Sequence, residues 1–249
     1  MQFLIIMNYR LRYLLSFILL LLPLSLHAQM FSVEESEQRV RPSGNALTVG
    51  LDFVDMQPRP DDQDIVYEWS DPVYRIRFEM PGIEAYAGYR TNVGNGGTGA
   101  DTLSYMNLGI TISGGMPLLG DRNFGIAIPV LLSSDMVRVR STSSQPEGEQ
   151  FRQSSVSIGL GAGGYITLAE RFRMRAELIP QFGFTMASLG RDSGQLFTLD
   201  GKVRFNIDRV INRYGFVVGY NYQFKRYSGG SEHYHYDLNS NAFVIGINF

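Results

Sequence analysis

The chain has 249 residues, with 22 Lys and Arg, 24 Asp and Glu, 3 His and no Cys, which gives a formal net charge of -2. The absence of cysteine excludes a disulfide scaffold, a cysteine-ligated metal or iron–sulfur site and a cysteine nucleophile. The small net charge argues against a general nucleic-acid binder. The 44% hydrophobic content, with 27 Gly, argues against a disordered chain.

Residues 1–28 have the pattern of a secretory signal peptide. Arg10 and Arg12 precede an apolar run over 14–22, and the small residue Ala28 suits signal-peptidase cleavage. A membrane anchor is the alternative, but the run is shorter than the ~20 apolar residues that a spanning helix needs. We therefore expect export and a mature N-terminus near Gln29. The polar stretch 29–45 is interpreted as a periplasmic tail, or alternatively as a short plug.

The remaining chain, 46–249, alternates between apolar and polar residues with a period of two. In 73–80, for example, Tyr74 and Ile76 share one face, whereas Arg75 and Arg77 share the other. This pattern predicts β-strands. We expect strands near 46–56, 73–80, 83–93, 103–116, 124–140, 152–168, 172–189, 196–208, 214–227 and 240–249.

The connections between these predicted strands alternate between short turns and longer Gly-, Ser- and Asp-rich loops. Short periplasmic turns and longer outside loops are typical of a bacterial outer-membrane barrel. The sequence therefore predicts an all-β fold, a transmembrane antiparallel up-and-down β-barrel of about ten strands, with eight as the alternative count. A secreted β-sandwich also alternates and is the competing interpretation.

Aromatic residues at the predicted strand ends favour the barrel, because aromatic girdles form at both membrane interfaces. The aromatics expected near the periplasmic interface are Phe124, Phe172, Phe205, Tyr214, Phe216 and Phe249. Those expected near the outer interface are Tyr67, Trp69, Tyr89, Tyr105, Phe197, Tyr222 and Tyr227.

The last predicted strand ends the sequence in Phe249, with Phe243, Ile245 and Ile247 at alternate positions before it. This ending resembles the terminal signature by which the outer-membrane assembly machinery recognises its substrates. With the signal peptide and the Gly-rich alternating strands, the chain resembles the small bacterial outer-membrane β-barrel proteins. The resemblance implies a location in the outer membrane of a Gram-negative cell.

The polar face of the predicted strands would line the barrel lumen. The charged residues assigned to it are Asp52, Arg75, Arg77, Glu79, Glu84, Arg90, Arg173, Arg175, Glu177, Asp200, Lys202, Arg204 and Lys225. Charges in a low-dielectric interior must be paired or hydrated. We expect a filled, salt-bridged lumen; the alternative is a narrow passive channel that mildly favours anions, because this set has more bases than acids.

One group of residues at the predicted outer rim could carry enzymatic chemistry. His233, His235 and Asp237 share a face at period two, and Asp62 and Asp64 lie in the first long loop. The omptin proteases, which are similar ten-stranded barrels, pair an Asp–His with two acids at the outer rim. This sequence departs from that pattern, because the order is His-x-Asp and the two acids lie in a Pro-flanked loop.

Together these patterns favour a non-enzymatic outer-membrane barrel with a structural or surface-interaction role. The narrow channel is the second hypothesis and the omptin-like protease the third. The expected partners are outer-membrane lipid and lipopolysaccharide, the barrel assembly machinery and a surface ligand bound by the outer loops. We expect no nucleic-acid partner, no cofactor and no metal.

Overall fold

The computed structural model describes residues 45–58, 69–94, 102–121, 123–141, 150–169, 171–187, 193–211, 213–228 and 235–249. The predicted signal peptide and almost all of the predicted tail lie outside these residues. Among the described residues, no helix is long and apolar enough to cross a membrane.

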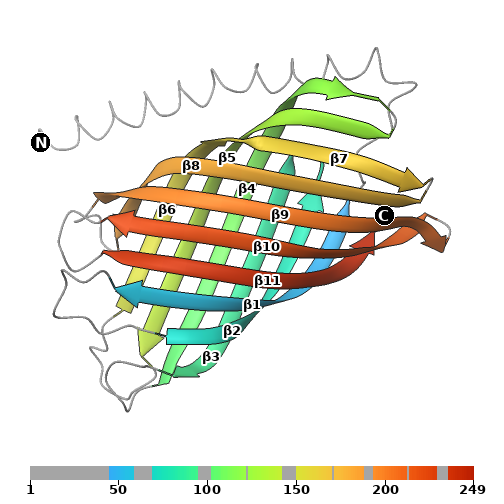
Figure 1. Ribbon diagram of the computed structural model, residues 1–249. Coiled ribbons are helices and arrows are strands. Elements are labelled where there is room, and N and C mark those ends of the chain that lie inside the picture. The colour runs from blue at the N-terminus through green and yellow to red at the C-terminus, as the bar shows by residue number, and fades with distance from the viewer. Residues whose placement is uncertain are drawn as a thin grey trace, which may run out of the picture. The chain divides into compact units, whose positions relative to one another are not determined.

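The described chain forms eleven strand segments that make ten barrel strands (Figure 1). Strands β6 and β7 are two parts of one barrel strand, because both pair with β5 on one side and β8 on the other. The break lies at Gly161, whose N–H donates to the Pro129 carbonyl at 3.0 Å. The segments are β1 Ala46–Pro58, β2 Trp69–Met80, β3 Ile83–Gly94, β4 Thr102–Gly120, β5 Phe124–Ser141, β6 Gln150–Leu160, β7 Ala162–Ala169, β8 Phe172–Ala187, β9 Ser193–Ile211, β10 Tyr214–Ser228 and β11 Tyr236–Asn248.

Each strand pairs antiparallel with its neighbour, and β1 pairs with β11 to close the sheet. Following the paired residues once around the barrel leads from Ala46 back to Pro58 on the same strand, an offset of 58 − 46 = 12 residues. With ten strands this offset corresponds to a strand tilt of about 40°. The tilt is visible in Figure 1, where the front strands β8–β11 cross the strands behind them steeply. The predicted barrel of ten strands is confirmed, and eight is wrong.

The barrel is apolar outside and polar over most of its interior, the reverse of a water-soluble protein. Outward-facing Tyr74 and Phe182 are 72% and 66% exposed, whereas Asp52 is 0% and Arg75 is 4% exposed. A single closed sheet with an exposed apolar wall excludes the β-sandwich, whose apolar faces pack together. Closure also leaves no sheet edge, which a membrane-spanning strand structure requires. The protein is therefore a transmembrane β-barrel of the outer-membrane type.

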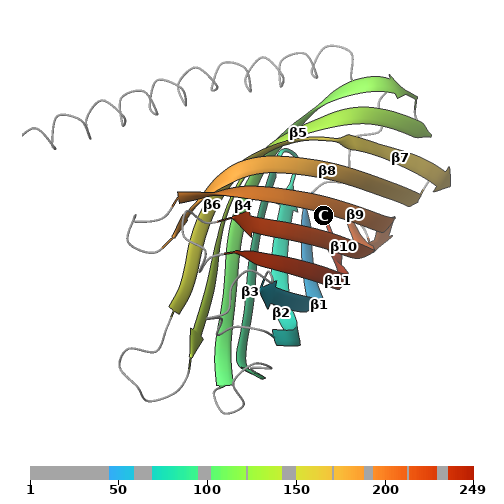
Figure 2. The ribbon, with the colours of Figure 1, turned by 60° about the vertical axis from the view of Figure 1, so that its left-hand side comes forward.

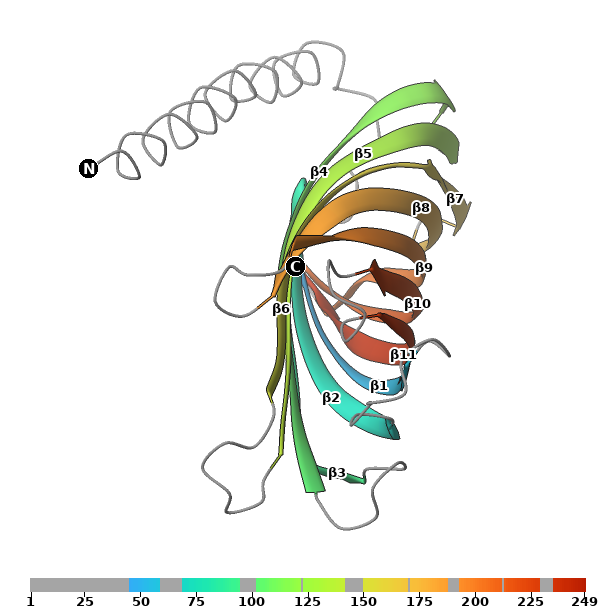
Figure 3. The same ribbon diagram turned by 90° about the vertical axis from the view of Figure 1, so that its left-hand side faces the viewer.

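The end of the barrel that carries both Ala46 and Asn248 also carries the short turns, so it is the periplasmic end. There β4, β5, β7 and β8 extend beyond β3, as Figures 2 and 3 show. Asp121 caps the β4–β5 turn: its Oδ1 accepts from the backbone N–H of Asn123 at 2.7 Å and of Phe124 at 2.9 Å. These two donors stabilise the carboxylate and lower the pKa of Asp121.

Two of the predicted girdle residues lie inside the barrel instead. Tyr105 and Tyr227 are 0% and 1% exposed and face the lumen near its outer end. By contrast, Tyr89 and Phe124 face outward with exposures of 56% and 44%. Tyr67 and the side chain of Trp69 lie outside the described residues.

The four residues of the predicted assembly signature face outward. Phe243 and Ile245 are 63% and 61% exposed, and Ile247 and Phe249 are 41% and 40% exposed. The N–H of Phe249 donates to the carbonyl of Asn45 at 2.8 Å, which ties the last residue to the start of β1. Recognition of this segment by the assembly machinery stays a prediction.

Replacement of Phe249 by Asn should leave most of the expressed chain outside the outer membrane, because the terminal apolar residue is lost from the predicted assembly signature. The fraction of folded barrel in outer-membrane fractions, scored by heat-modifiable gel mobility, measures this. Phe124→Asn is the matched control, because Phe124 also faces outward at the periplasmic end, with 44% exposure, but lies on β5 outside the predicted signature; this variant should insert like the wild type. A Phe249→Asn chain that inserts like the wild type would contradict the prediction.

Candidate functional site: the lumen

All thirteen lumen residues predicted from the sequence project inward from their strands. Six of them are buried and six are half-buried; Arg175, near the periplasmic end, is exposed, at 48% of its side chain. Alternation along each tilted strand stacks these charges at successive depths. The lumen is therefore built from layers, and each layer is described from the centre outward.

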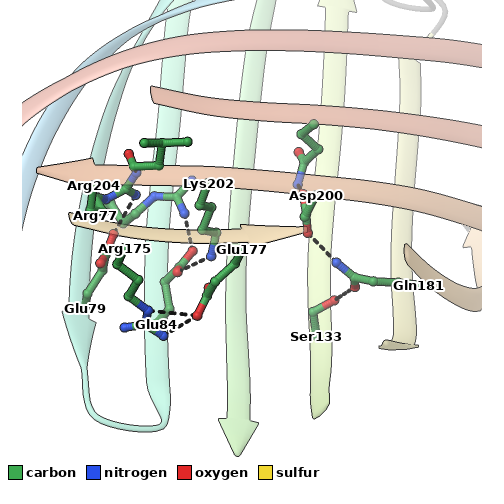
Figure 4. Close-up of polar contacts among 12 residues, drawn as sticks. Arg77, Glu79, Glu84, Ser133, Arg175, Glu177, Gln181, Asp200, Lys202 and Arg204 are labelled. Carbon is green, nitrogen blue, oxygen red and sulfur yellow. Dashed lines mark hydrogen bonds and ion pairs between the residues drawn. The ribbon is translucent and has the colours of Figure 1, made fainter. Parts of the chain in front are cut away.

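The central layer is an ion-pair triad around Glu84 (Figure 4). Arg77 of β2 pairs with Glu84 Oε1, and Lys202 Nζ lies 2.5 Å from Glu84 Oε2. Glu84 is on β3 and Lys202 on β9, which are five strand positions apart in either direction around the ring of ten. The Lys202–Glu84 pair therefore joins opposite walls and crosses the lumen.

A second crossing pair lies nearer the periplasmic end. Arg204 Nη2 of β9 is 2.8 Å from Glu79 Oε1 of β2. Beside it, Arg175 Nε donates to Glu177 Oε1 at 2.9 Å within β8. At the periplasmic rim, Arg173 Nη2 donates to Asp208 at 2.6 Å.

On the outer side of the central triad, two further ion pairs fill the lumen. Arg75 pairs with Asp52, which also accepts from Ser240. Lys225 of β10 pairs with Asp135 of β5. All of these charges are 10% exposed or less, so each is compensated where water is scarce.

Tyr86 connects the central triad with these outer pairs. The guanidinium carbons of Arg75 and Arg77 each lie 5.2 Å from the centre of its ring, within the range of cation–π attraction. Its hydroxyl donates to Asp135 at 3.4 Å.

Asp200 is held by amides in place of a cation. Gln223 Nε2 donates to Asp200 at 2.7 Å, and Gln181 Nε2 donates to its other oxygen. Gln181 in turn accepts from the hydroxyls of Ser133 and Ser157 at 2.8 Å each. This network joins β10, β9, β8, β6 and β5 across one half of the lumen.

The outer end of the lumen is closed by apolar and tyrosine side chains, which we call the outer apolar layer. All of its members are 3% exposed or less, so they pack against one another as in a soluble core. The layer consists of Val54, Met56, Val73, Tyr105, Val137, Val139, Leu196, Tyr227, Tyr236 and Leu238. The lumen is thus polar over its central and periplasmic parts and apolar at its outer end, which the sequence did not predict.

The described lumen contains a cavity of about 20 Å³ between the central triad and the outer pairs, lined by Glu84, Asp135, Lys202 and Lys225 among others. That volume accommodates about one water molecule. The buried amide of Asn221 also lines it, and neither polar atom of this amide has a protein partner. A bridging water there would satisfy both atoms.

Sequence reasoning missed three acids that face the lumen: Asp71, Asp135 and Asp208. Asp71 lies 3.6 Å from Arg90, and the other two pair with Lys225 and Arg173. With them, the described lumen holds eight acids and eight bases in place of five acids and eight bases. The basic surplus on which the alternative of an anion-favouring channel was based is therefore absent from the described lumen.

The predicted enzymatic residues are described only in part. Asp62, Asp64 and His233 lie outside the described residues. Asp237 accepts from Arg226 through two bonds of 3.1 Å, and His235 directly precedes β11. Among the described residues, no three His, Cys, Asp or Glu side chains gather closely enough to hold a metal ion.

Comparison with known proteins finds similar barrels among solved structures but no matching sequence. No family model and no curated protein matches the chain. The outer-membrane protease OmpT from Escherichia coli is 9% identical, with 82% of this chain and 95% of that chain covered and a TM-score of 0.44. Ail of Yersinia pestis is 10% identical, with 83% and 97% covered and a TM-score of 0.32. OprG from Pseudomonas aeruginosa is 9% identical, with 83% and 95% covered and a TM-score of 0.34. These solved structures are bacterial outer-membrane β-barrel proteins.

Proposed function

We propose that the protein is a non-conducting, non-enzymatic outer-membrane barrel that serves as a rigid membrane scaffold for its outer connecting segments. The observation that carries this proposal is the Lys202–Glu84 ion pair between opposite strands of the ring. A solute moving along the barrel axis would have to break this pair.

Several further layers support the same conclusion. The Arg204–Glu79 pair crosses the lumen on the periplasmic side, and the outer apolar layer lies on the other side. Opening a continuous aqueous path would require separating buried charges and unpacking buried side chains at several depths. Each of these steps costs free energy, since a separated buried charge loses its partner and gains little water.

The scaffold role is based on the part of the barrel that can contact other molecules, which is its outer end. The strands are joined at the outer end by five connections, after β1, β3, β5, β8 and β10, that are longer than the periplasmic turns. With a filled interior and a lipid-facing wall, the outer end is the surface that the barrel presents to molecules outside the cell. A surface ligand, if bound, would be bound there.

Liposome swelling tests the closed lumen with uncharged and zwitterionic solutes. Vesicles containing the folded full-length mature barrel should swell in isotonic arabinose or glycine no faster than vesicles without protein. Folding in the vesicles is verified by heat-modifiable gel mobility. Swelling that rises with the amount of folded barrel would contradict the proposal and favour a narrow channel.

A further inference from the structure

A shallow groove crosses the lipid-facing wall on strands β7 to β10, which are adjacent in the sheet (Figure 1). Its volume is about 540 Å³. Leu178, which lines it, faces outward with 53% exposure. The floor of the groove consists of small residues, namely Ala162, Gly164, Ala176 and Gly201. Small residues alone do not identify an occupant, because lipid chains fill such a surface as well as a protein does.

Polar side chains face the lipid directly beside this groove, on β10 and β11. Asn221 and Ala242 are buried in the lumen, so the alternating Tyr220, Tyr222 and Asn241 face outward. The Tyr220 hydroxyl donates to Asn241 Oδ1 at 2.5 Å. Among the described residues, neither the side-chain nitrogen of Asn241 nor the hydroxyl of Tyr222 has a hydrogen-bond partner.

These free polar groups lie within the apolar band of the wall. Tyr222 and Asn241 are each four residues below the outer-end pair of Arg226 and Asp237 along their strands. Four residues on a strand tilted by about 40° correspond to a depth of about 10 Å. At that depth no water is present to hydrogen-bond a hydroxyl or an amide, so leaving these groups without a partner costs free energy.

The polar groups and the floor of the groove lie at nearly the same depth. Tyr222 is paired in register with Asn241 on one side and with Gly201 on the other. Paired residues on neighbouring strands differ in depth by about 3 Å at this tilt. A two-fold axis along the membrane normal brings together residues of equal depth from two copies of a protein. Tyr222 of one copy would then lie over Gly201 of the other, and the reverse contact would form at the same time.

We propose that two copies of the protein associate in the membrane through this face, which consists of the groove, Tyr222 and Asn241. A second copy is favoured over lipid, because acyl chains cannot hydrogen-bond the free amide and hydroxyl. It is favoured over a different protein, because the polar groups complement themselves: an amide carries donors and an acceptor, and a phenol hydroxyl both donates and accepts. The small residues let the two walls approach closely, as they do between membrane helices. The face lies outside the lumen, so this association does not depend on whether the barrel conducts.

The test is energy transfer between donor- and acceptor-labelled full-length mature barrels in phospholipid vesicles, measured over a series of lipid-to-protein ratios. Because the sequence contains no Cys, a single Gln57→Cys substitution at the outer end provides the labelling site. The wild type should show energy transfer above the level of random proximity. Gly201→Leu should weaken association at least ~10-fold, because its side chain fills the groove. A Cβ at this position would lie 3.6 Å from both Leu178 Cδ1 and Tyr222 Cβ, an ordinary contact distance, so the variant should fold.

Gly114→Leu is the matched control, because Gly114 lies on β4, across the barrel from the groove, and a Cβ there would meet no atom within 4 Å. This variant should associate like the wild type. Tyr222→Phe and Asn241→Leu remove the free polar groups and should each weaken association severalfold.

Three results would overturn the proposal. The first is energy transfer of the folded wild type no higher than random proximity gives. The second is association of Gly201→Leu that equals that of the wild type or that of Gly114→Leu. The third is a folded Tyr222→Phe/Asn241→Leu double variant that associates like the wild type, and this result decides the question if Gly201→Leu does not fold. Heat-modifiable gel mobility verifies folding of each variant.

Discussion

Replacement of Glu84 by Gln should lower the free energy of unfolding of the barrel by about 3–5 kcal/mol, the cost of leaving buried charges without their partner. Glu84 is the shared carboxylate of Arg77 and Lys202, and its side chain is 14% exposed. The neutral amide keeps the size of the side chain but leaves two inward cations facing each other. Equilibrium unfolding in urea with the protein in phospholipid vesicles measures the change.

A matched substitution distinguishes the stability cost of removing a buried, paired carboxylate from the cost of removing an exposed one. Asp237→Asn breaks the exposed pair with Arg226 and should cost no more than about 1 kcal/mol, as exposed pairs do. Adding Lys202→Met to Glu84→Gln should restore part of the loss, because one uncompensated cation is removed. Equal costs for Glu84→Gln and Asp237→Asn would mean that the triad does not hold the walls together.

Replacement of Tyr227 by Ala should destabilise the barrel by about 3–5 kcal/mol, the range for truncating a buried aromatic side chain. Tyr227 is 1% exposed and is paired in register with Leu196 on one side and Tyr236 on the other, all within the outer apolar layer. Its truncation leaves a cavity in that layer. The same vesicle-based unfolding experiment measures the effect.

Two tyrosine variants isolate the cause of this loss. Tyr227→Phe keeps the ring and should cost clearly less than Tyr227→Ala, since packing of the ring dominates. Tyr74 faces outward at 72% exposure, so Tyr74→Ala should cost less than half as much as Tyr227→Ala. Similar losses for Tyr74→Ala and Tyr227→Ala would contradict the placement of Tyr227 inside the lumen.

The strands and their faces could be predicted because alternation is a local property of the sequence. Where an inward face is charged throughout, as for Arg173, Arg175 and Glu177, the pattern identifies the lumen side directly. The predicted strand over 152–168 is observed as β6 and β7, interrupted at Gly161. The glycines in this segment did not indicate where the strand is interrupted. The interruption depends on the contact of Gly161 with Pro129 on a neighbouring strand, which the sequence does not reveal.

The alternation fails where the lumen itself is apolar. The inward face of β5 carries Leu131 and Val137 on either side of Asp135, so polarity no longer distinguishes the faces there. For this reason Asp135 was missed, and Tyr105 and Tyr227 were assigned to the membrane interface. Apolar inward residues at the outer end have the same local pattern as lipid-facing ones.

The pairing of charges across the lumen lay beyond sequence reasoning for a different reason. Which bases meet which acids depends on the 12-residue offset accumulated around the barrel, and no single hairpin contains it. Lys202 and Glu84 are 118 residues apart and meet only because the sheet closes with this register. The pairing that bridges opposite walls is therefore a property of closure, whereas the charge balance of the lumen depends on the three inward acids Asp71, Asp135 and Asp208 that sequence reasoning missed.

Single-channel recording of the folded wild-type mature barrel in a planar bilayer tests the closed lumen most directly. The account predicts no conductance steps in 1 M KCl at moderate voltage, from preparations in which heat-modifiable gel mobility verifies folding and insertion. Reproducible steps of uniform size that scale with the amount of inserted protein would contradict it. In that case, ions would be passing the Lys202–Glu84 crossing and the outer apolar layer, and the protein would be a channel.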